Sequence, residues 1–142
     1  MRFLGLDIGE VRIGVALSDE SGTIASPLTT VAAKQPYDAI AAEFRAICEE
    51  NEVRALVVGL PFSMSGGAGG TSARAAKTLG RKLAQTLGLK VAFADERFTT
   101  ALADRALLEA DVNRKKRKTV VDKVAAALML QTFLDGRRNR DA

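Results

Sequence analysis

The sequence predicts an α/β fold built on a five-stranded mixed sheet with helices on both of its faces. Three strand-like segments come first and are joined by short turns, which is typical of an antiparallel meander. From residue 37 onward, helical and strand-like segments alternate, which predicts parallel strands joined by right-handed crossovers. The 142 residues, 47% of them hydrophobic, are enough for a buried core, and we expect residues 1–142 to form a single domain.

The first three strands are predicted from apolar runs separated by turn residues. Residues 2–8 form the first run, and residues 11–18 form the second. Residues 23–31 follow the turn sequence Asp-Glu-Ser-Gly and form the third run. Pro27 lies within it and favours an edge strand, because proline cannot donate a ladder hydrogen bond.

The rest of the chain alternates between helical and strand patterns. Apolar residues recur at helical spacing after residue 37 and again after residue 72, and Gly88 is expected to end the second of these helices. Short β-branched runs between the helices favour buried strands. The predicted helices are 37–50, 72–87, 99–110 and 119–135, the last ended by Gly136, and the predicted strands between them are 53–59 and 90–95.

Three acidic residues stand at the ends of predicted elements. Asp7 ends the first strand, Glu96 follows the last strand, and Asp122 lies near the start of the last helix. Carboxylates in such places are costly unless they are paired or hold a metal ion. The chain has no histidine and one cysteine, so a hard cation such as Mg²⁺, which takes oxygen ligands, is the natural partner. The three acids therefore predict metal-dependent phosphodiester chemistry.

The composition excludes several classes of protein. Without histidine, the chain cannot build Ser-His-Asp or Cys-His mechanisms or the usual zinc hydrolase sites. Cys48 is the single cysteine, and we expect it to be a small core residue. No apolar run approaches the roughly 20 residues of a membrane span, and the N-terminus lacks the layout of a signal peptide. We therefore expect a cytoplasmic protein with no membrane partner.

The first two acidic positions also have structural alternatives. Asp7 could cap the turn that follows it, in which Gly9 permits tight backbone geometry and the close approach of a phosphate. Asp95 and Glu96 would point to opposite faces of a strand, so only one of them can face a given site. We favour Glu96 as the ligand, with Asp95 and Arg97 in support. The same residues could instead form the start of a helix.

Asp122 has the strongest structural alternative. Together with Thr119 it resembles a capping box, with aspartate where glutamate or glutamine is usual. The predicted helix is nevertheless apolar on nearly every side, and Asp122 shares a side with Ala125, Ala126 and Met129. We therefore expect the carboxylate to face protein rather than water, and we favour its role as a ligand.

Positive charge is concentrated in two short segments. The net charge is +4, and without the five basic residues of 114–118 it would be −1. Arg137, Arg138 and Arg140 form the second cluster, near the end of the chain. Such blocks repel themselves, so they either contact a polyanion or stay solvated as loops and tails.

Within these basic stretches, four residues are candidates for phosphate contact. Lys116, Arg117 and Lys118 are expected to hold a nucleic-acid backbone near the acidic residues. Arg12, on the second predicted strand, could contact phosphate or form a surface ion pair. The few aromatic residues give little support to a stacking platform for bases.

Four sequence blocks resemble one known family. Residues 6–19, with the sequence Leu-Asp-Ile-Gly-Glu-Val-Arg-Ile-Gly-Val-Ala-Leu-Ser-Asp, resemble the opening of the YqgF family. Its members are called pre-16S rRNA nucleases or RuvX-type Holliday junction resolvases. The further matching blocks, in the same order as in the family, are 58–61 with the glycine-rich loop after it, 95–100, and 116–118 followed by 121–126.

This resemblance covers essentially the whole chain and implies an RNase H-like fold. It also implies that Asp7, Glu96 and Asp122 gather at one edge of the sheet and bind Mg²⁺ or Mn²⁺. Many metal nucleases of this fold have a fourth acid close to the last one. Here residues 125 and 126 are alanine, which argues against the tight binding of two metal ions.

The resulting prediction is a metal-dependent nuclease, most consistent with processing of the 5′ end of pre-16S rRNA. The first alternative is a Holliday junction resolvase acting on branched DNA, which would need a homodimer to make two symmetric cuts, whereas a ribonuclease can act as a monomer. The second is a non-catalytic RNA-binding factor in ribosome assembly that uses the same basic segments. A nucleotide phosphatase or kinase-like enzyme is the last, and the chain is short for that two-lobed architecture.

Overall fold

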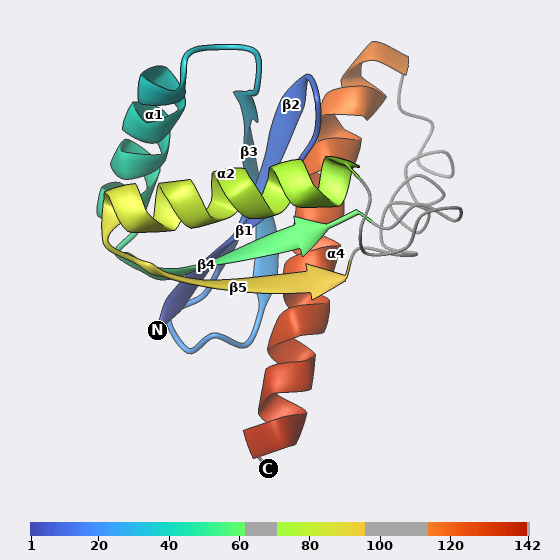
Figure 1. The fold of residues 1–142 in the computed structure, drawn as a ribbon. Coiled ribbons are helices and arrows are strands. Elements are labelled where there is room, and N and C mark those ends of the chain that lie inside the picture. Colours follow the sequence, from blue (N-terminus) through green and yellow to red (C-terminus); the bar gives the residue numbers. More distant parts are fainter. Residues whose placement is uncertain (62–70, 96–113, 142) are drawn as a thin grey trace.

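The computed structural model describes residues 1–61, 71–95 and 114–141, and it contains one five-stranded sheet (Figure 1). Each strand falls in a segment that the sequence predicts as a strand. The bounds are β1 (Arg2–Ile8), β2 (Arg12–Ser18), β3 (Ala25–Ala32), β4 (Val53–Leu60) and β5 (Lys90–Asp95).

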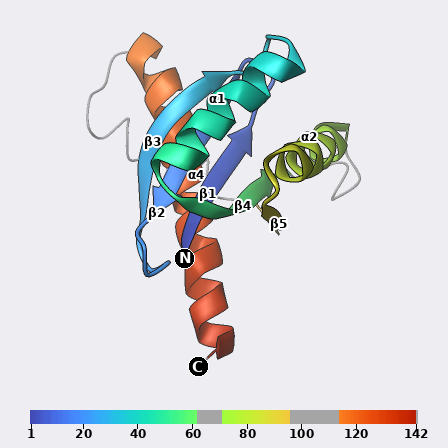
Figure 2. The ribbon, with the colours of Figure 1, turned by 90° about the vertical axis from the view of Figure 1, so that its left-hand side faces the viewer.

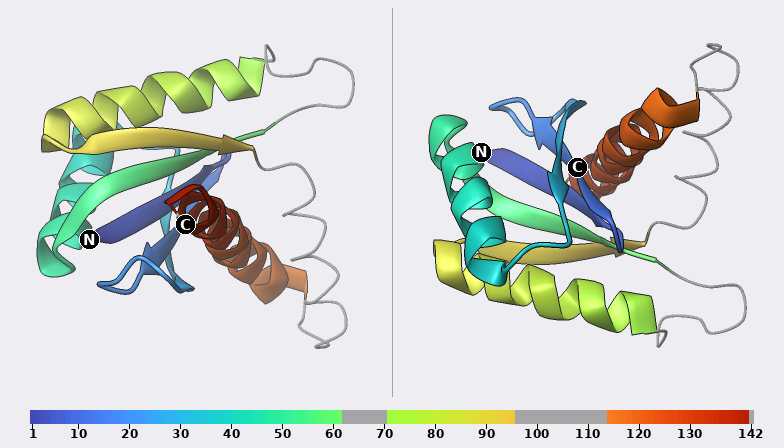
Figure 3. Two further views of the ribbon diagram at one scale, coloured as in Figure 1. Left: turned by 90° about the horizontal axis from the view of Figure 1, so that it is seen from below. Right: turned by 90° about the horizontal axis from the view of Figure 1, so that it is seen from above.

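The helices of the described ranges lie on both faces of this sheet. Both views of Figure 3 show α2 on one side of the strands and α4 on the other, and Figure 2 shows α1 on the same side as α2. None of these helices is long and apolar enough to cross a membrane. Their bounds are α1 (Tyr37–Glu50), α2 (Thr71–Leu87) and α4 (Arg114–Asp141).

The sheet is mixed, and β1 is its central strand. The strand order is β3-β2-β1-β4-β5. The pairs β1–β2 and β2–β3 are antiparallel, whereas β1–β4 and β4–β5 are parallel. The predicted meander and the predicted parallel strands are thus both confirmed. Because β1, β4 and β5 run in the same direction, their C-terminal ends meet at one edge of the sheet.

The larger part of the core lies between the sheet and the pair α1–α2. Leu4 and Leu6 of β1 face this side, and Phe44 of α1 and Leu83 of α2 pack against them. Cys48 of α1 also belongs to this cluster, which confirms its expected place in the core. Burying apolar area contributes about 25 cal/mol per Å², so these large side chains supply much of the driving force for folding.

The other face of the sheet is covered by α4. Phe3 meets Phe133 of α4 with ring centroids 6.0 Å apart in an edge-to-face arrangement. Gly5 lets the helix come close, because a Cβ at that position would lie 3.0 Å from the Cβ of Leu130. Gln131 fixes the helix against β3, since its side chain accepts a hydrogen bond from the amide of Ala25 at 2.9 Å.

Two predicted bounds of the last helix are wrong. The helix begins at Arg114 rather than at residue 119, because lysine and arginine favour helices and residues 114–118 extend it. It also continues through Gly136 to Asp141. A glycine costs a helix only about 1 kcal/mol, and the next turn is held because the Arg137 guanidinium lies over the ring of Phe3, 5.0 Å from its centroid.

The other element predictions agree closely with the structure, with one small shift. The third strand begins at Ala25 rather than at residue 23. The amides of Thr23 and Ile24 donate instead to the Asp19 carboxylate, at 2.8 and 3.1 Å, and this turn delays the strand. Gly88 follows α2 with φ of +68°, as expected of a glycine that ends a helix. The predicted helix 99–110 lies outside the described residues.

Candidate active site

Asp7 lies near the C-terminal end of the central strand, with glycine on both sides. It is half-buried. Its register partner on β2 is Gly14, and its partner on β4 is Gly59. Residues that are directly opposite one another in a sheet project to the same face, so no side chain from either neighbouring strand crowds this carboxylate. The sheet leaves room here for a cation and its other ligands.

Asp7 faces the side of the sheet that α4 covers. Side chains alternate along a strand, so Phe3, Gly5 and Asp7 share one face. Phe3 and Gly5 both contact α4, which places Asp7 on the same side as that helix.

The backbone of Asp122 rests directly on β2 beside Asp7. A Cβ built on Gly14 would lie 2.0 Å from the carbonyl oxygen of Asp122, closer than two such atoms can approach. The helix therefore uses the space that a side chain at position 14 would fill. Because Gly14 is also the register partner of Asp7, the fold brings Asp7 and Asp122, which are far apart in the sequence, to one corner of the sheet.

The Asp122 side chain is held by Arg12 of β2. The Arg12 Nε donates to the Asp122 Oδ2 at 2.7 Å, and the two side chains are 32% and 29% exposed. Of the two roles the sequence left open for Arg12, the structure contains the ion pair, with Asp122 as its partner. The capping-box alternative for Asp122 is wrong, because the helix begins at Arg114, two turns earlier.

The last strand separates Asp95 from Asp7. Ala94 pairs with Gly59 and packs in the cluster beneath α4, whereas Asp95 pairs with Leu60. Alternation therefore places Asp95 on the face opposite to that of Asp7. Glu96 and Arg97 lie outside the described residues. Within residues 1–61, 71–95 and 114–141, no three carboxylate, thiol or imidazole side chains are grouped closely enough to hold a metal ion.

Comparisons with known proteins agree with this geometry. Residues 1–136 match the model of a family described as "RuvX: Holliday junction resolvase". The chain belongs to the RuvX family. A relative from Clostridium botulinum (strain Alaska E43 / Type E3) is 46% identical over 95% of this chain and 97% of its own length. One from Caldanaerobacter subterraneus subsp. tengcongensis is 44% identical over 98% and 99%. Both are named "Putative pre-16S rRNA nuclease".

Solved structures show the same fold. Thermus thermophilus RuvC is similar with a TM-score of 0.59 and 17% identity, over 98% of this chain and 97% of that chain. A second RuvC structure, in complex with a Holliday junction substrate, has a TM-score of 0.57 and 16% identity, over 97% and 96%. The predicted RNase H-like fold is therefore confirmed for this RuvX-family chain.

Gly9 has a local structural reason to be glycine in this RuvX-family protein. Its amide donates to the carbonyl oxygen of Arg12 at 3.0 Å, which closes the turn between β1 and β2. A Cβ on Gly9 would lie 2.9 Å from that same oxygen. The tight turn thus accounts for the glycine, and a role in phosphate approach stays a prediction.

A cavity of about 390 Å³ lies beside this turn. Its lining comes from the ends of β1 and β4 and from the first turns of α2, so it opens at the same edge of the sheet as Asp7. The described lining residues are Ile8, Gly9, Glu10, Pro61, Ser72 and Ala75.

The basic residues predicted to contact phosphate lie in the first turns of α4. Lys116, Arg117 and Lys118 belong to the helix that holds Asp122. Asp122 is one to two helical turns further along, and the rise of about 1.5 Å per residue puts the two segments within about 10 Å along the axis. This helix therefore brings a block of positive charge to the end of the sheet where Asp7 lies.

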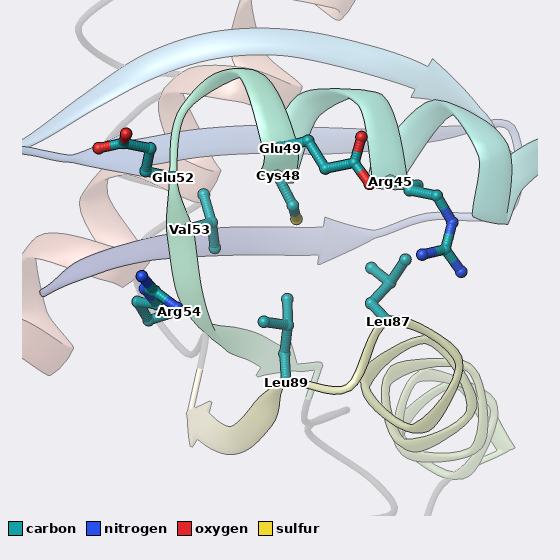
Figure 4. A pocket seen from close by; sticks show the side chains of 8 residues that line it. All are labelled: Arg45, Cys48, Glu49, Glu52, Val53, Arg54, Leu87 and Leu89. Atoms are coloured by element: carbon teal, nitrogen blue, oxygen red, sulfur yellow. The ribbon is translucent and has the colours of Figure 1, made fainter.

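A second cavity, of about 330 Å³, lies at the other end of the fold (Figure 4). It is lined by residues from the end of α1 and the start of β4, among them Cys48, Glu49 and Arg54. Burial raises the pKa of the Cys48 thiol to about 11, so this group stays protonated at neutral pH and is a poor nucleophile. The cavity therefore offers no alternative centre for covalent chemistry.

Proposed function

We propose that this protein is a metal-dependent nuclease that acts in the cytoplasm in processing of the 5′ end of pre-16S rRNA. The observation on which the proposal rests most heavily is the contact between Gly14 and the Asp122 backbone, because it brings two carboxylates to one corner of the sheet. The name shared by the relatives supports the substrate.

The residues at this corner fit a hard divalent cation. Asp7 and Asp122 offer carboxylate oxygens, which Mg²⁺ and Mn²⁺ accept as ligands, and the glycines beside Asp7 leave space for water and phosphate. We assign Glu96 as the third ligand, with Asp95 and Arg97 in support. Such an ion, when bound, supplies an activated water and stabilises the charge that develops on the leaving oxygen.

The other residues of the proposed site bind and orient the substrate. Lys116, Arg117 and Lys118 hold the phosphate backbone from the start of α4, and Gly9 keeps the β1–β2 turn clear of it. Contacts of this kind carry little sequence information, so the position of the cut depends on the shape of the substrate.

The test compares two substrates and two aspartates. Purified wild-type protein, Asp7→Asn and Asp135→Asn are each incubated with a 5′-extended 16S precursor or a four-way DNA junction, in Mg²⁺, Mn²⁺ or EDTA. Asp135 is the matched control, because it lies on α4 but is half exposed and pairs with Arg138. We expect metal-dependent cutting of the RNA that Asp7→Asn abolishes and Asp135→Asn preserves.

A second function is favoured by the family description. Metal-dependent cutting of the junction and not of the RNA would assign the protein as a resolvase, and a dimer should then be found by light scattering. Binding of RNA without any cutting would contradict the nuclease and support a ribosome assembly factor. Loss of folding in Asp7→Asn, measured by circular dichroism, would contradict the ligand role of Asp7.

A further inference from the structure

We infer that Arg12 is a positioning residue, which holds the Asp122 carboxylate in the orientation that a metal ion needs. The inference rests on the proposed function, since it concerns the same metal site. It replaces direct phosphate contact, which the sequence alone left possible for Arg12. The basis is the only ion pair in the described residues that joins a strand to a helix.

The contact is built by two elements that meet only in the folded chain. Arg12 is the first residue of β2, and its Nε reaches the Asp122 Oδ2 of α4 at 2.7 Å, across 110 residues of sequence. Less than a third of either side chain is exposed, so solvent screens this pair less than a pair on the open surface. A hydrogen bond between charged groups at this distance is short and directional.

The backbone and the side chain of Asp122 are fixed by separate residues of the same strand. Gly14 receives the carbonyl of Asp122, and this contact sets where the helix lies. The contact leaves the side-chain torsions of Asp122 undetermined. Arg12 sets those by engaging one carboxylate oxygen, Oδ2, so that the other oxygen, Oδ1, is the one presented to a cation.

This arrangement matches the general role of outer residues at metal sites. Groups that hydrogen-bond to a ligand fix its orientation, and their loss typically lowers metal affinity by about 10- to 100-fold. A phosphate contact would behave differently. Its loss weakens nucleic-acid binding and reduces the dependence of that binding on salt by about one unit of slope, without affecting metal binding in the absence of nucleic acid.

The test measures Mn²⁺ affinity without nucleic acid, from the electron paramagnetic resonance signal of the free ion. The proteins are the wild type, Arg12→Ala, Arg12→Lys, Asp122→Asn and the double variant Arg12→Ala/Asp122→Asn. Arg138→Ala is the matched control, because Arg138 pairs with another aspartate of the same helix at 2.6 Å.

We expect Arg12→Ala to lower Mn²⁺ affinity by about 10-fold or more, Arg12→Lys to recover most of the loss, and Arg138→Ala to change nothing. If Arg12 acts through Asp122, removing it in the Asp122→Asn background should cause no further loss. Binding of the RNA precursor in EDTA should keep its wild-type salt dependence in Arg12→Ala. Melting temperatures separate these effects from loss of folding, and Arg12→Lys provides the test if Arg12→Ala does not fold.

The inference is overturned if Mn²⁺ affinity is unchanged in Arg12→Ala, or if the losses from Arg12→Ala and Asp122→Asn add. Its failure is distinct from that of the proposed function. Wild-type protein that binds no Mn²⁺ would contradict the metal site itself, whereas wild-type binding that does not respond to Arg12 would contradict only the positioning role.

Discussion

Two arginine–aspartate pairs on α4 have nearly the same contact distance and very different surroundings. Arg12–Asp122 joins β2 to α4 at 2.7 Å, and its side chains are 32% and 29% exposed. Arg138–Asp135 lies within the helix at 2.6 Å, three residues apart, and its side chains are 52% and 50% exposed. The second pair belongs to the surface of one helix, whereas the first depends on the packing of two elements.

The difference teaches that the surroundings of an ion pair, more than its length, indicate what it does. Hydrogen bonds from Gln131 and Arg138 lower the pKa of Asp135, yet nothing else in the fold depends on that carboxylate. Asp122 stands where the helix backbone touches the central part of the sheet, beside Asp7. A fixed carboxylate at that place can serve a metal site, and one on the open helix surface cannot.

The largest expected effect on stability comes from the contact beneath Asp122. Gly14→Ala puts a Cβ 2.0 Å from a backbone oxygen, which cannot rotate away, so α4 must move. Overpacking of this kind costs about 1–3 kcal/mol, and we expect Gly14→Ala to reach the upper part of that range and to lose metal-dependent cleavage. The free energy of unfolding in urea is the measurement.

Gly5→Ala is the control for that substitution. Its Cβ would lie 3.0 Å from the side chain of Leu130, which can adjust more readily than backbone. We expect a smaller loss of stability and retained cleavage. Equal losses at positions 5 and 14 would contradict the special role given to the contact with Asp122.

The coupling energies of the two ion pairs should also differ. Exposed pairs contribute about 0.2–1 kcal/mol, and we expect Arg138–Asp135 near the bottom of that range and Arg12–Asp122 near the top. Double-mutant cycles with alanine at Arg12 and Asp122, and at Arg138 and Asp135, give the two values from urea unfolding. A larger coupling energy for the surface pair would reverse the comparison.

A smaller effect is expected at Asp19, an acid whose bonds are local. Hydrogen bonds from the amides of Thr23 and Ile24, and from the Ser21 hydroxyl, lower its pKa from 3.8 to about 2. A lowered pKa stabilises the fold above the pKa of the unfolded chain, and this stabilisation is lost as the pH falls through the folded value. We expect Asp19→Asn to lower the melting temperature at pH 7, with a difference from wild type that fades between about pH 4 and pH 2.

Cleavage by Asp19→Asn should match that of the wild type, since the β2–β3 turn lies at the other end of β2 from Arg12. A difference in melting temperature that stayed constant down to pH 2 would show that the carboxylate charge is not what stabilises the turn.

Much of the fold follows from local patterns that the sequence displays directly. Alternation and apolar runs predict all five strands, and Gly88 marks the end of α2 because the chain needs a positive φ there. The end of the last helix could not be predicted in the same way. Gly136 looks like a stop, but Arg137 packs over Phe3 from the first strand, and that contact is invisible in the local sequence.

The candidate site was predictable in its acids and not in its supports. Asp7 and Asp122 were found because charge inside an apolar element is unusual. The contact of Arg12 with Asp122, and of Gly14 with the helix backbone, joins segments 110 and 108 residues apart, and no periodicity reveals it. A glycine inside the apolar run of β2 was the one available signal, since such a glycine often marks the close approach of another backbone.

The most direct test of the central claim is to locate bound Mn²⁺ by the broadening of backbone amide signals in NMR spectra of the ¹⁵N-labelled protein. Substoichiometric Mn²⁺ is added to the free protein, with Mg²⁺ as a competitor. A metal site at the end of the central strand predicts that the amides of Asp7, Gly14 and Asp122 broaden first and recover when Mg²⁺ is added. Broadening that begins instead at Cys48, Glu49 and Arg54, around the cavity at the other end, would contradict it.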